Sequence, residues 1–280
     1  MSFSAYARTI KLSHTIFSAP FALAATALAA REHGITVWTV VWILVALTAA
    51  RSSAMGFNRI VDRDIDAANP RTASREIPAG ELSVKAAWGW TLGSAGIFGL
   101  ASWALGPLCL LLFPVALLVI WGYSLVKRVS WACHLVLGLA LALAPTAAWI
   151  AVAGEMSWTA GLLSLVVGTW VAGFDILYSC QDAGFDRDEG LHSIPARLGL
   201  KGAMVVSALL HVVTVAGLVA LPAVVELGWP YWLGTALMSV ILVYEHAIVT
   251  PTDLSRIDKA FFDLNGYVSL AFLGSVLISL

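Results

Sequence analysis

Apolar blocks of about 20 residues follow one another along the whole chain, and short polar segments separate them. An α-helix of this length crosses the hydrocarbon of a bilayer and satisfies its own backbone hydrogen bonds there. The pattern therefore predicts an all-α membrane protein, a single integral membrane domain over residues 1–280 with about nine transmembrane helices. The predicted spans are 14–30, 35–57, 84–105, 107–126, 131–153, 158–181, 202–221, 231–250 and 260–279.

The composition supports a membrane protein and argues against other classes. Hydrophobic residues make up 60% of the chain and charged residues only 12%, whereas a soluble domain has about 25% charged residues. The net charge of −1 gives no basic field of the kind that attracts nucleic acid. The cysteines lie apart within apolar segments, without zinc spacing or a disulfide pattern, and are interpreted as small buried side chains. They are Cys109, Cys133 and Cys180.

Positive charge lies almost entirely on one side of the predicted membrane. If the N-terminus is cytoplasmic, the cytoplasmic segments with their adjoining helix ends hold every Lys and Arg except Arg31. Cytoplasmic loops are rich in Lys and Arg, so we expect a cytoplasmic N-terminus. Polar residues extend to His14, which is not the layout of a secretory signal, so the first helix is interpreted as a retained span.

Acidic side chains recur at helical spacing in the segment NRIVDRDIDAANPRTASREIPAG, which begins at Asn58. Asp62 and Asp66 follow Asn58 at intervals of four residues. Four residues leave an offset of about 40° around a helix axis. If the second span continues through this segment, all three side chains project from one face.

A second acidic segment, QDAGFDRDEGLHSIPARLG, begins at Gln181 and repeats this spacing. Asp175, Asp182 and Asp186 would lie within about 40° of one another on a continuous helix, with Tyr178 at the edge of their face. Ionised side chains at membrane depth are costly and tend to mark function. A D-R-D sequence stands in both segments and hints at an internal duplication.

Carboxylates gathered in this way need positive partners. Mg²⁺ fits, because it prefers oxygen ligands, keeps several waters and typically bridges a few carboxylates to substrate phosphates. No set of His and Cys with zinc spacing competes with it. The alternative is two solvated loops neutralised by their own arginines, which the matching spacing at two helix ends disfavours.

At these residues the sequence resembles the UbiA superfamily of intramembrane prenyltransferases. The family's N-x-x-x-D-x-x-x-D motif stands at Asn58, Asp62 and Asp66, and its D-x-x-x-D motif stands at Asp182 and Asp186. RTASREIPAG is similar to the family's R-T-x-x-R-P-L-P-x-G, and GYSLVKR, residues 122–128, is similar to its Y-x-x-x-K-R loop. The resemblance covers essentially the whole chain and includes a topology of nine helices.

The resemblance implies an enzyme that transfers a polyprenyl group from polyprenyl diphosphate to an acceptor. It implies that the two acidic helix ends converge on a central, lipid-accessible cavity and hold Mg²⁺ against the diphosphate. The implied metal ligands are Asn58, Asp62, Asp66, Asp182 and Asp186, and Asp175 is a further catalytic carboxylate. The candidates for contacting phosphate oxygens are Asn58, Arg59, Arg63, Lys127 and Arg128.

The implied acceptor is an aromatic carboxylic acid of ubiquinone or menaquinone biosynthesis. Lys11 and His14 replace the arginine–aspartate arrangement of hydroxybenzoate prenyltransferases, and the chain resembles a branch with MqnP-type menaquinone enzymes. Both 1,4-dihydroxy-6-naphthoate and 4-hydroxybenzoate therefore stay open. Lys11 is the candidate cation for the carboxylate, His14 and Asp175 are candidate bases, and Tyr178 completes the predicted acceptor site.

Two other functions are alternatives to the prenyltransferase. An ion-coupled secondary transporter fits intramembrane acids, but here the acids cluster at one membrane face without paired broken helices. The signature of lipid-phosphate alcohol transferases is absent. Histidines in the spans are interpreted as structural and further arginines as ordering the loops; these are His134, His211, His246, Arg71, Arg75 and Arg197. The predicted location is the bacterial inner membrane, with the active site on the cytoplasmic side.

Overall fold

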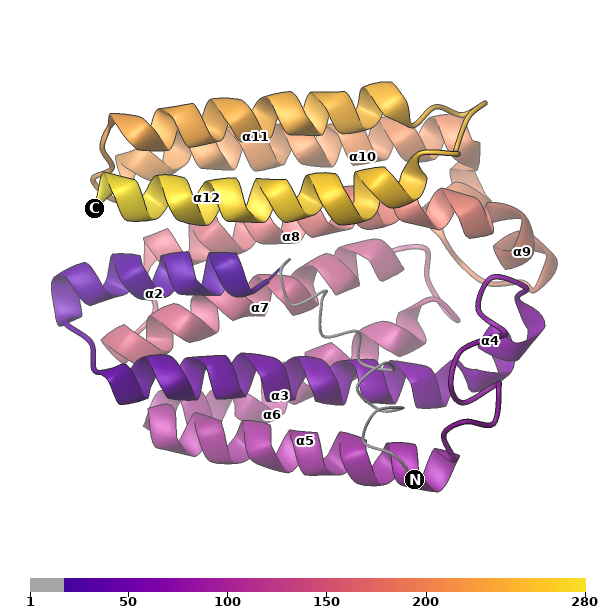
Figure 1. The fold of residues 1–280 in the computed structure, drawn as a ribbon, viewed down its shortest axis with the longest axis horizontal. Coiled ribbons are helices and arrows are strands. Elements are labelled where there is room, and N and C mark those ends of the chain that lie inside the picture. Colours follow the sequence, from indigo (N-terminus) through magenta and orange to yellow (C-terminus); the bar gives the residue numbers. More distant parts are fainter. Residues whose placement is uncertain (1–17) are drawn as a thin grey trace. The chain divides into compact units, whose positions relative to one another are not determined.

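The structure is a computed structural model that describes residues 18–280 (Figure 1). Its regular elements over this range are helices, and the only β-contact among these residues is an isolated bridge between Thr250 and Asp253. The all-α prediction is therefore confirmed. The described chain forms two compact units: unit 1 comprises residues 37–125, and unit 2 comprises residues 18–36 and 126–280. The single-domain prediction stays a prediction.

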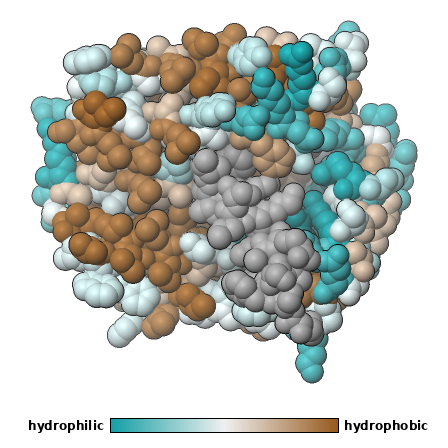
Figure 2. Space-filling view, in the orientation of Figure 1, coloured by the Kyte–Doolittle hydropathy of each residue, from teal (hydrophilic) through white to brown (hydrophobic). Residues whose placement is uncertain are grey.

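The helices have the length and composition of membrane spans. Each predicted block overlaps a helix, and 7 helices of the described chain are long and apolar enough to cross a membrane. Helix α2 (Ala19–His33) has only 15 described residues, and the continuous helix α5 (Val84–Leu105) contains Gly, Ser and Trp residues that lower its mean hydropathy. The nine crossings and the cytoplasmic N-terminus therefore stay predictions. Broad apolar areas cover part of the face drawn in Figure 2, as expected of helices that face lipid.

Unit 1 contains α3 (Val37–Val61), α4 (Arg63–Ala68), α5 and α6 (Pro107–Val126). Helix α3 packs along α5, and Phe57 of α3 stacks on Trp121 of α6 with 4.9 Å between ring centroids. The Trp121 indole donates a hydrogen bond to Ser53, whose hydroxyl donates to the Thr91 carbonyl of α5. Hydrogen bonds between helices of this kind hold apolar spans in register.

Unit 2 is built around α8 (Trp158–Ser179), which packs against both α7 (Cys133–Ala153) and α10 (Ile194–Ala220). Figure 1 also shows α11 (Trp229–Ile248) beside α12 (Asn265–Ser279). Gly138 of α7 lies directly against the backbone of Gly168 in α8. The short elements of this unit are η2 (Cys180–Asp182), α9 (Ala183–Asp188), η3 (Leu221–Ala223) and η4 (Lys259–Leu264).

Local sequence signals explain where several helices begin and end. Ser157 and Ser193 cap α8 and α10 through their side-chain oxygens. Gly106 and Gly154 end α5 and α7 with positive φ of 128° and 74°, at the predicted boundaries between spans 84–105 and 107–126 and between spans 131–153 and 158–181. Helix α10 begins at Ile194 rather than near residue 202, with a break at Gly199 (φ 70°), because Ser193 supplies an N-cap ahead of the apolar block.

Candidate active site

The first acidic motif lies at the end of α3, where the helix is interrupted. Helix α3 ends at Val61, Asp62 has φ −90° and ψ 2°, and α4 begins at Arg63. The expectation of one continuous helix is therefore wrong. The amides of Asp62 and Asp66 still donate to the carbonyls four residues earlier, at 2.9 and 2.7 Å, so the spacing survives the break. The Asn58 side-chain amide donates to Asp62 Oδ2 at 2.7 Å.

Asp66 is a buried acid of this motif, with 4% of its surface exposed. Its Oδ1 lies 2.5 Å from Arg75 Nη1, and the Thr72 hydroxyl donates to its carbonyl at 3.1 Å. Its Oδ2 is buried without a hydrogen-bond partner among residues 18–280. Arg75, which the sequence suggested only orders the loop, thus contacts a motif carboxylate directly.

The two predicted phosphate-binding arginines of unit 1 differ in their surroundings. Arg59 is buried, and its guanidinium donates to Asn58 Oδ1 at 3.4 Å. Arg63 is more exposed, donates to the Ile60 carbonyl at 3.1 Å and lies 3.3 Å from Asp64. Arg59 is therefore fixed within the motif, and Arg63 lies at its rim.

The second acidic motif repeats this construction in unit 2. Helix α8 ends at Ser179, a 3₁₀ turn carries the chain to Asp182, and α9 begins at Ala183. Asp182 has φ −96° and ψ 2°, nearly the backbone conformation of Asp62. A continuous helix is wrong here too. Asp182 and Asp186 are buried.

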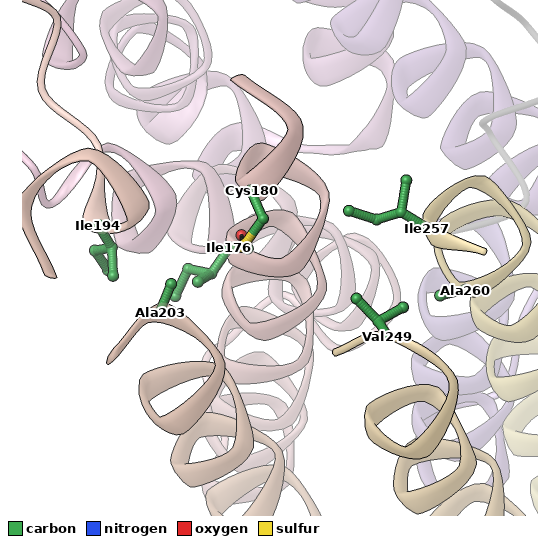
Figure 3. Close-up of a cluster of buried hydrophobic side chains, with 7 residues drawn as sticks. All are labelled: Ile176, Cys180, Ile194, Ala203, Val249, Ile257 and Ala260. Carbon is green, nitrogen blue, oxygen red and sulfur yellow. Dashed lines mark hydrogen bonds between the residues drawn. The ribbon is translucent and has the colours of Figure 1, made fainter. Parts of the chain in front are cut away.

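Apolar packing supports the end of α8 behind this motif. Ile176 and Cys180 face Ile194 and Ala203 of α10, and Val249, Ile257 and Ala260 complete the cluster (Figure 3). These side chains come from segments far apart in the sequence. The position of the second motif thus depends on long-range contacts within unit 2.

Lys127 forms an ion pair with Asp186, the more deeply buried acid of the second motif. Its Nζ lies 2.7 Å from Oδ1 of Asp186, which is fully buried. The loop after α9 holds both residues, because the Leu191 amide donates to the Asp186 carbonyl at 2.7 Å and the His192 amide donates to the Lys127 carbonyl at 2.8 Å. Arg128, the next predicted phosphate contact, is half-buried beside Lys127.

The donor set of each motif fits a magnesium ion. Asp66 and Asp186 each bury an Oδ2 atom that has no hydrogen-bond partner in the described part of the chain. Burying a carboxylate oxygen without a hydrogen-bond partner costs free energy, and a bound cation would supply the missing interaction. No group of three His, Cys, Asp or Glu residues within the described range could hold a metal alone. Mg²⁺ prefers oxygen donors such as these carboxylates, and it keeps several waters and shares its ligands with phosphates.

Asp175 forms a pair with His134 that sequence reasoning missed. His134 Nδ1 lies 2.7 Å from Asp175 Oδ2, and the Ile194 amide donates to His134 Nε2 at 3.4 Å. Because Nε2 accepts, the proton of a neutral imidazole lies on Nδ1 and points at the carboxylate. His134 is buried, whereas 22% of the Asp175 side chain is exposed. His134, interpreted from sequence as structural, thus orients a predicted catalytic acid.

The remaining predicted acceptor residues are placed only in part. Tyr178 stacks its ring on Phe261, with 4.0 Å between centroids. Lys11 and His14 lie outside the described residues. No pattern within a single segment of the sequence predicts the stacking of Tyr178 on Phe261, because the two residues come from different helices.

A second polar cluster within unit 2 was also absent from the sequence predictions. Asn265 accepts a hydrogen bond from the Trp170 indole at 2.7 Å and donates to Glu245 at 3.2 Å. His211 lies 3.0 Å from His246, in agreement with a structural role for both histidines. Each of these contacts joins two different helices, and the Trp170–Asn265 contact joins helices far apart in the sequence.

Comparison with known proteins identifies the family. The model of the UbiA prenyltransferase family matches residues 18–273. The 4-hydroxybenzoate octaprenyltransferase of Vibrio campbellii is 28% identical over 90% of this chain and 89% of its own length. The mitochondrial 4-hydroxybenzoate polyprenyltransferase of Aedes aegypti is 31% identical over 86% of this chain and 55% of its own length.

Solved structures agree in fold. The apo structure of a UbiA homologue from Aeropyrum pernix K1 has a TM-score of 0.85 and 33% identity, covering 95% of this chain and 97% of that one. A homologue from Archaeoglobus fulgidus, solved with DMAPP and Mg²⁺, has a TM-score of 0.78 at 18% identity and covers 98% of each chain. The chain thus belongs to the UbiA prenyltransferase family and is an integral membrane prenyltransferase.

Proposed function

We propose that this enzyme transfers a polyprenyl group from polyprenyl diphosphate to an aromatic carboxylic acid, either 1,4-dihydroxy-6-naphthoate or 4-hydroxybenzoate, in quinone biosynthesis. The observation that carries the proposal is the pair of matching motifs, each with a buried acid that has one oxygen on a cationic side chain and the other without a partner. The names of the relatives support the reaction class. Family membership also favours a transferase over the secondary transporter.

In this proposal, the motif residues hold Mg²⁺ and the diphosphate. When bound, Mg²⁺ would neutralise phosphate oxygens and so assist departure of the leaving group. Lys127, which pairs with Asp186, and Arg128 would contact oxygens of the diphosphate. Arg59 and Arg63 of the first motif are proposed to contact diphosphate oxygens as well. The proposed metal ligands are Asn58, Asp62, Asp66, Asp182 and Asp186.

The proposed reaction breaks the allylic carbon–oxygen bond, and its electron pair leaves with diphosphate. A carbon of the acceptor ring attacks the allylic carbon, and the hydrogen on that ring carbon is then lost as a proton. We assign this proton to Asp175, since His134 holds one of its carboxylate oxygens and the side chain is partly exposed. Tyr178, Lys11 and His14 complete the proposed acceptor site.

The same proposal places the enzyme in a bacterial inner membrane with its active site on the cytoplasmic side, in one integral domain. The distribution of Lys and Arg supports this orientation, since Arg31 alone lies on the opposite predicted side. The family model, which spans residues 18–273, supports one functional domain.

A competition assay tests the proposed reaction. The purified protein receives a set of prenyl diphosphates and equal amounts of both aromatic acids, and mass spectrometry identifies the product. We expect one prenylated acid with one diphosphate released per product, no product in EDTA, and recovery when Mg²⁺ exceeds the chelator. Diphosphate release without a prenylated acid, or full turnover in EDTA, would contradict the proposal.

Replacement of His134 tests its role at Asp175. In His134→Leu, we expect kcat to fall by about 10- to 100-fold, with little change in the KM for prenyl diphosphate, because the donor to Asp175 Oδ2 is lost. In His134→Asn, the amide nitrogen replaces Nδ1 as donor, so much of the activity should return. Steady-state kinetics of both variants provide the measurement. Equal losses in the two variants would show that hydrogen-bond donation to Asp175 is not the role of His134.

A further inference from the structure

A pocket of about 620 Å³ lies on unit 2, beside the loop that follows the second motif. The segment that precedes α7, the loop that follows α9 and the first turn of α10 form its walls. Neither Asp182 nor Asp186 lines it. The pocket has the volume of a small-ligand site, for which about 300–1,000 Å³ is usual.

The lining of the pocket is positively charged. Arg187 and Arg197 line it, and no acidic side chain does. Both arginines are exposed, and neither has a carboxylate partner in the part of the chain that the structure describes. Because two guanidinium groups line the pocket without carboxylate partners, the pocket favours binding of an anionic ligand. Phosphate is a suitable anion, since its oxygens match the paired N–H groups of arginine.

Aromatic and apolar side chains locate this charge near the edge of the membrane. The Arg197 guanidinium lies 4.9 Å from the centre of the Trp131 ring, and Trp131 precedes the first residue of the α7 span, Cys133. Trp is enriched at headgroup depth. Val129, also in the lining, is 77% exposed and offers an apolar surface beside the two cations.

We propose that this pocket binds the phosphate of an anionic ligand at the membrane surface, supplied by a phospholipid headgroup. Basic pockets at the ends of transmembrane helices bind anionic headgroups in this way. The exposed Val129 beside the arginines fits a ligand whose phosphate is attached to acyl chains. The other source of the same chemistry is free diphosphate, and the test below separates the two.

The pocket shares a wall with the proposed catalytic site. His192 belongs to its lining, and the His192 amide donates to the Lys127 carbonyl. The adjacent Leu191 amide holds the carbonyl of Asp186. A bound phosphate would therefore rest on the loop that positions the Lys127–Asp186 pair.

Binding is measured on the full chain in detergent, in EDTA so that the proposed magnesium sites do not contribute. Native mass spectrometry follows three probes added separately: short-chain phosphatidylglycerol, short-chain phosphatidylcholine and inorganic diphosphate. We expect the protein to bind phosphatidylglycerol in preference to phosphatidylcholine. Arg187→Gln/Arg197→Gln should weaken phosphatidylglycerol binding by about tenfold or more, because charge-assisted hydrogen bonds are lost.

Arg256→Gln is the matched control, since it removes one exposed cation that does not line the pocket. It should bind all three probes like the unmodified protein. The proposed binding site would be wrong if the double variant bound phosphatidylglycerol as the unmodified protein does, or if Arg256→Gln lost as much phosphatidylglycerol binding as the double variant. If the protein bound diphosphate through these arginines but did not bind phosphatidylglycerol, the phosphate site would be supported and the proposed lipid ligand would be wrong.

The single variant Arg197→Gln, expected to show part of the loss of phosphatidylglycerol binding, is used if the double variant unfolds. No arm requires turnover, so the result is independent of the proposed reaction.

Discussion

Replacing Asp186 by Asn should lower the rate of prenyl transfer by about 10²- to 10³-fold. Asp186 is fully buried, one oxygen lies 2.7 Å from Lys127 Nζ, and the other has no partner among the described residues. Asn keeps the size of the side chain but removes the charge proposed to hold Mg²⁺. Initial rates over a range of Mg²⁺ concentrations provide the measurement, and the magnesium requirement should rise as the rate falls.

Asp188 offers the matched control on the same short helix. It is exposed, and Asp188→Asn removes the same charge at the rim of the motif, so near-unchanged rates are expected. The first motif offers the equivalent comparison, because Asp66 is buried and Asp64 is exposed. If substitutions of the buried and of the exposed acids lowered the rate equally, the proposed metal-ligand role would be wrong. The net negative charge of the segment would then explain the loss.

Replacing Gly138 by Ala should destabilise unit 2 by about 1–3 kcal/mol. A Cβ at Gly138 would collide with the Gly168 carbonyl, and it would approach the Ala172 side chain to 3.2 Å. Small residues permit such close helix contacts within membranes. The added methyl must separate α7 from α8, and His134 and Asp175 lie on these two helices. Thermal unfolding in detergent measures the loss, and activity should fall with it.

Gly161→Ala is the control for this substitution. Gly161 is also in α8, but a Cβ there meets no atom within 4 Å. Because Ala has the higher helix propensity, this variant should be as stable as the unmodified protein or slightly more stable. A Gly138→Ala protein that unfolds at the same temperature as Gly161→Ala would contradict the close-packing account.

Hydropathy predicted the helices well because a bilayer imposes a length and a composition on each span. It could not locate the breaks at Asp62 and Asp182, since the four-residue spacing of the acidic side chains continues through both. The start of α10 was misplaced because Ser193 caps a polar first turn that hydropathy alone does not reveal.

The site was predictable where its residues are close in sequence and unpredictable where they are not. Both acidic motifs are local patterns, and so is the segment GYSLVKR, whose resemblance to a family loop made Lys127 a candidate. The pairing of His134 with Asp175 joins different helices, and periodicity carries no information about such partners. Arg75 was underestimated for a similar reason, because its contact with Asp66 arises from the fold of the intervening loop.

The matching backbone at Asp62 and Asp182 has a consequence for how such an enzyme can change over evolutionary time. In each motif the bend, the short helix after it and the buried acid are encoded within a single short stretch of sequence. A substitution in one stretch therefore changes no residue that forms the bend of the other. Selection can adjust either half separately while the long spans that carry them are retained.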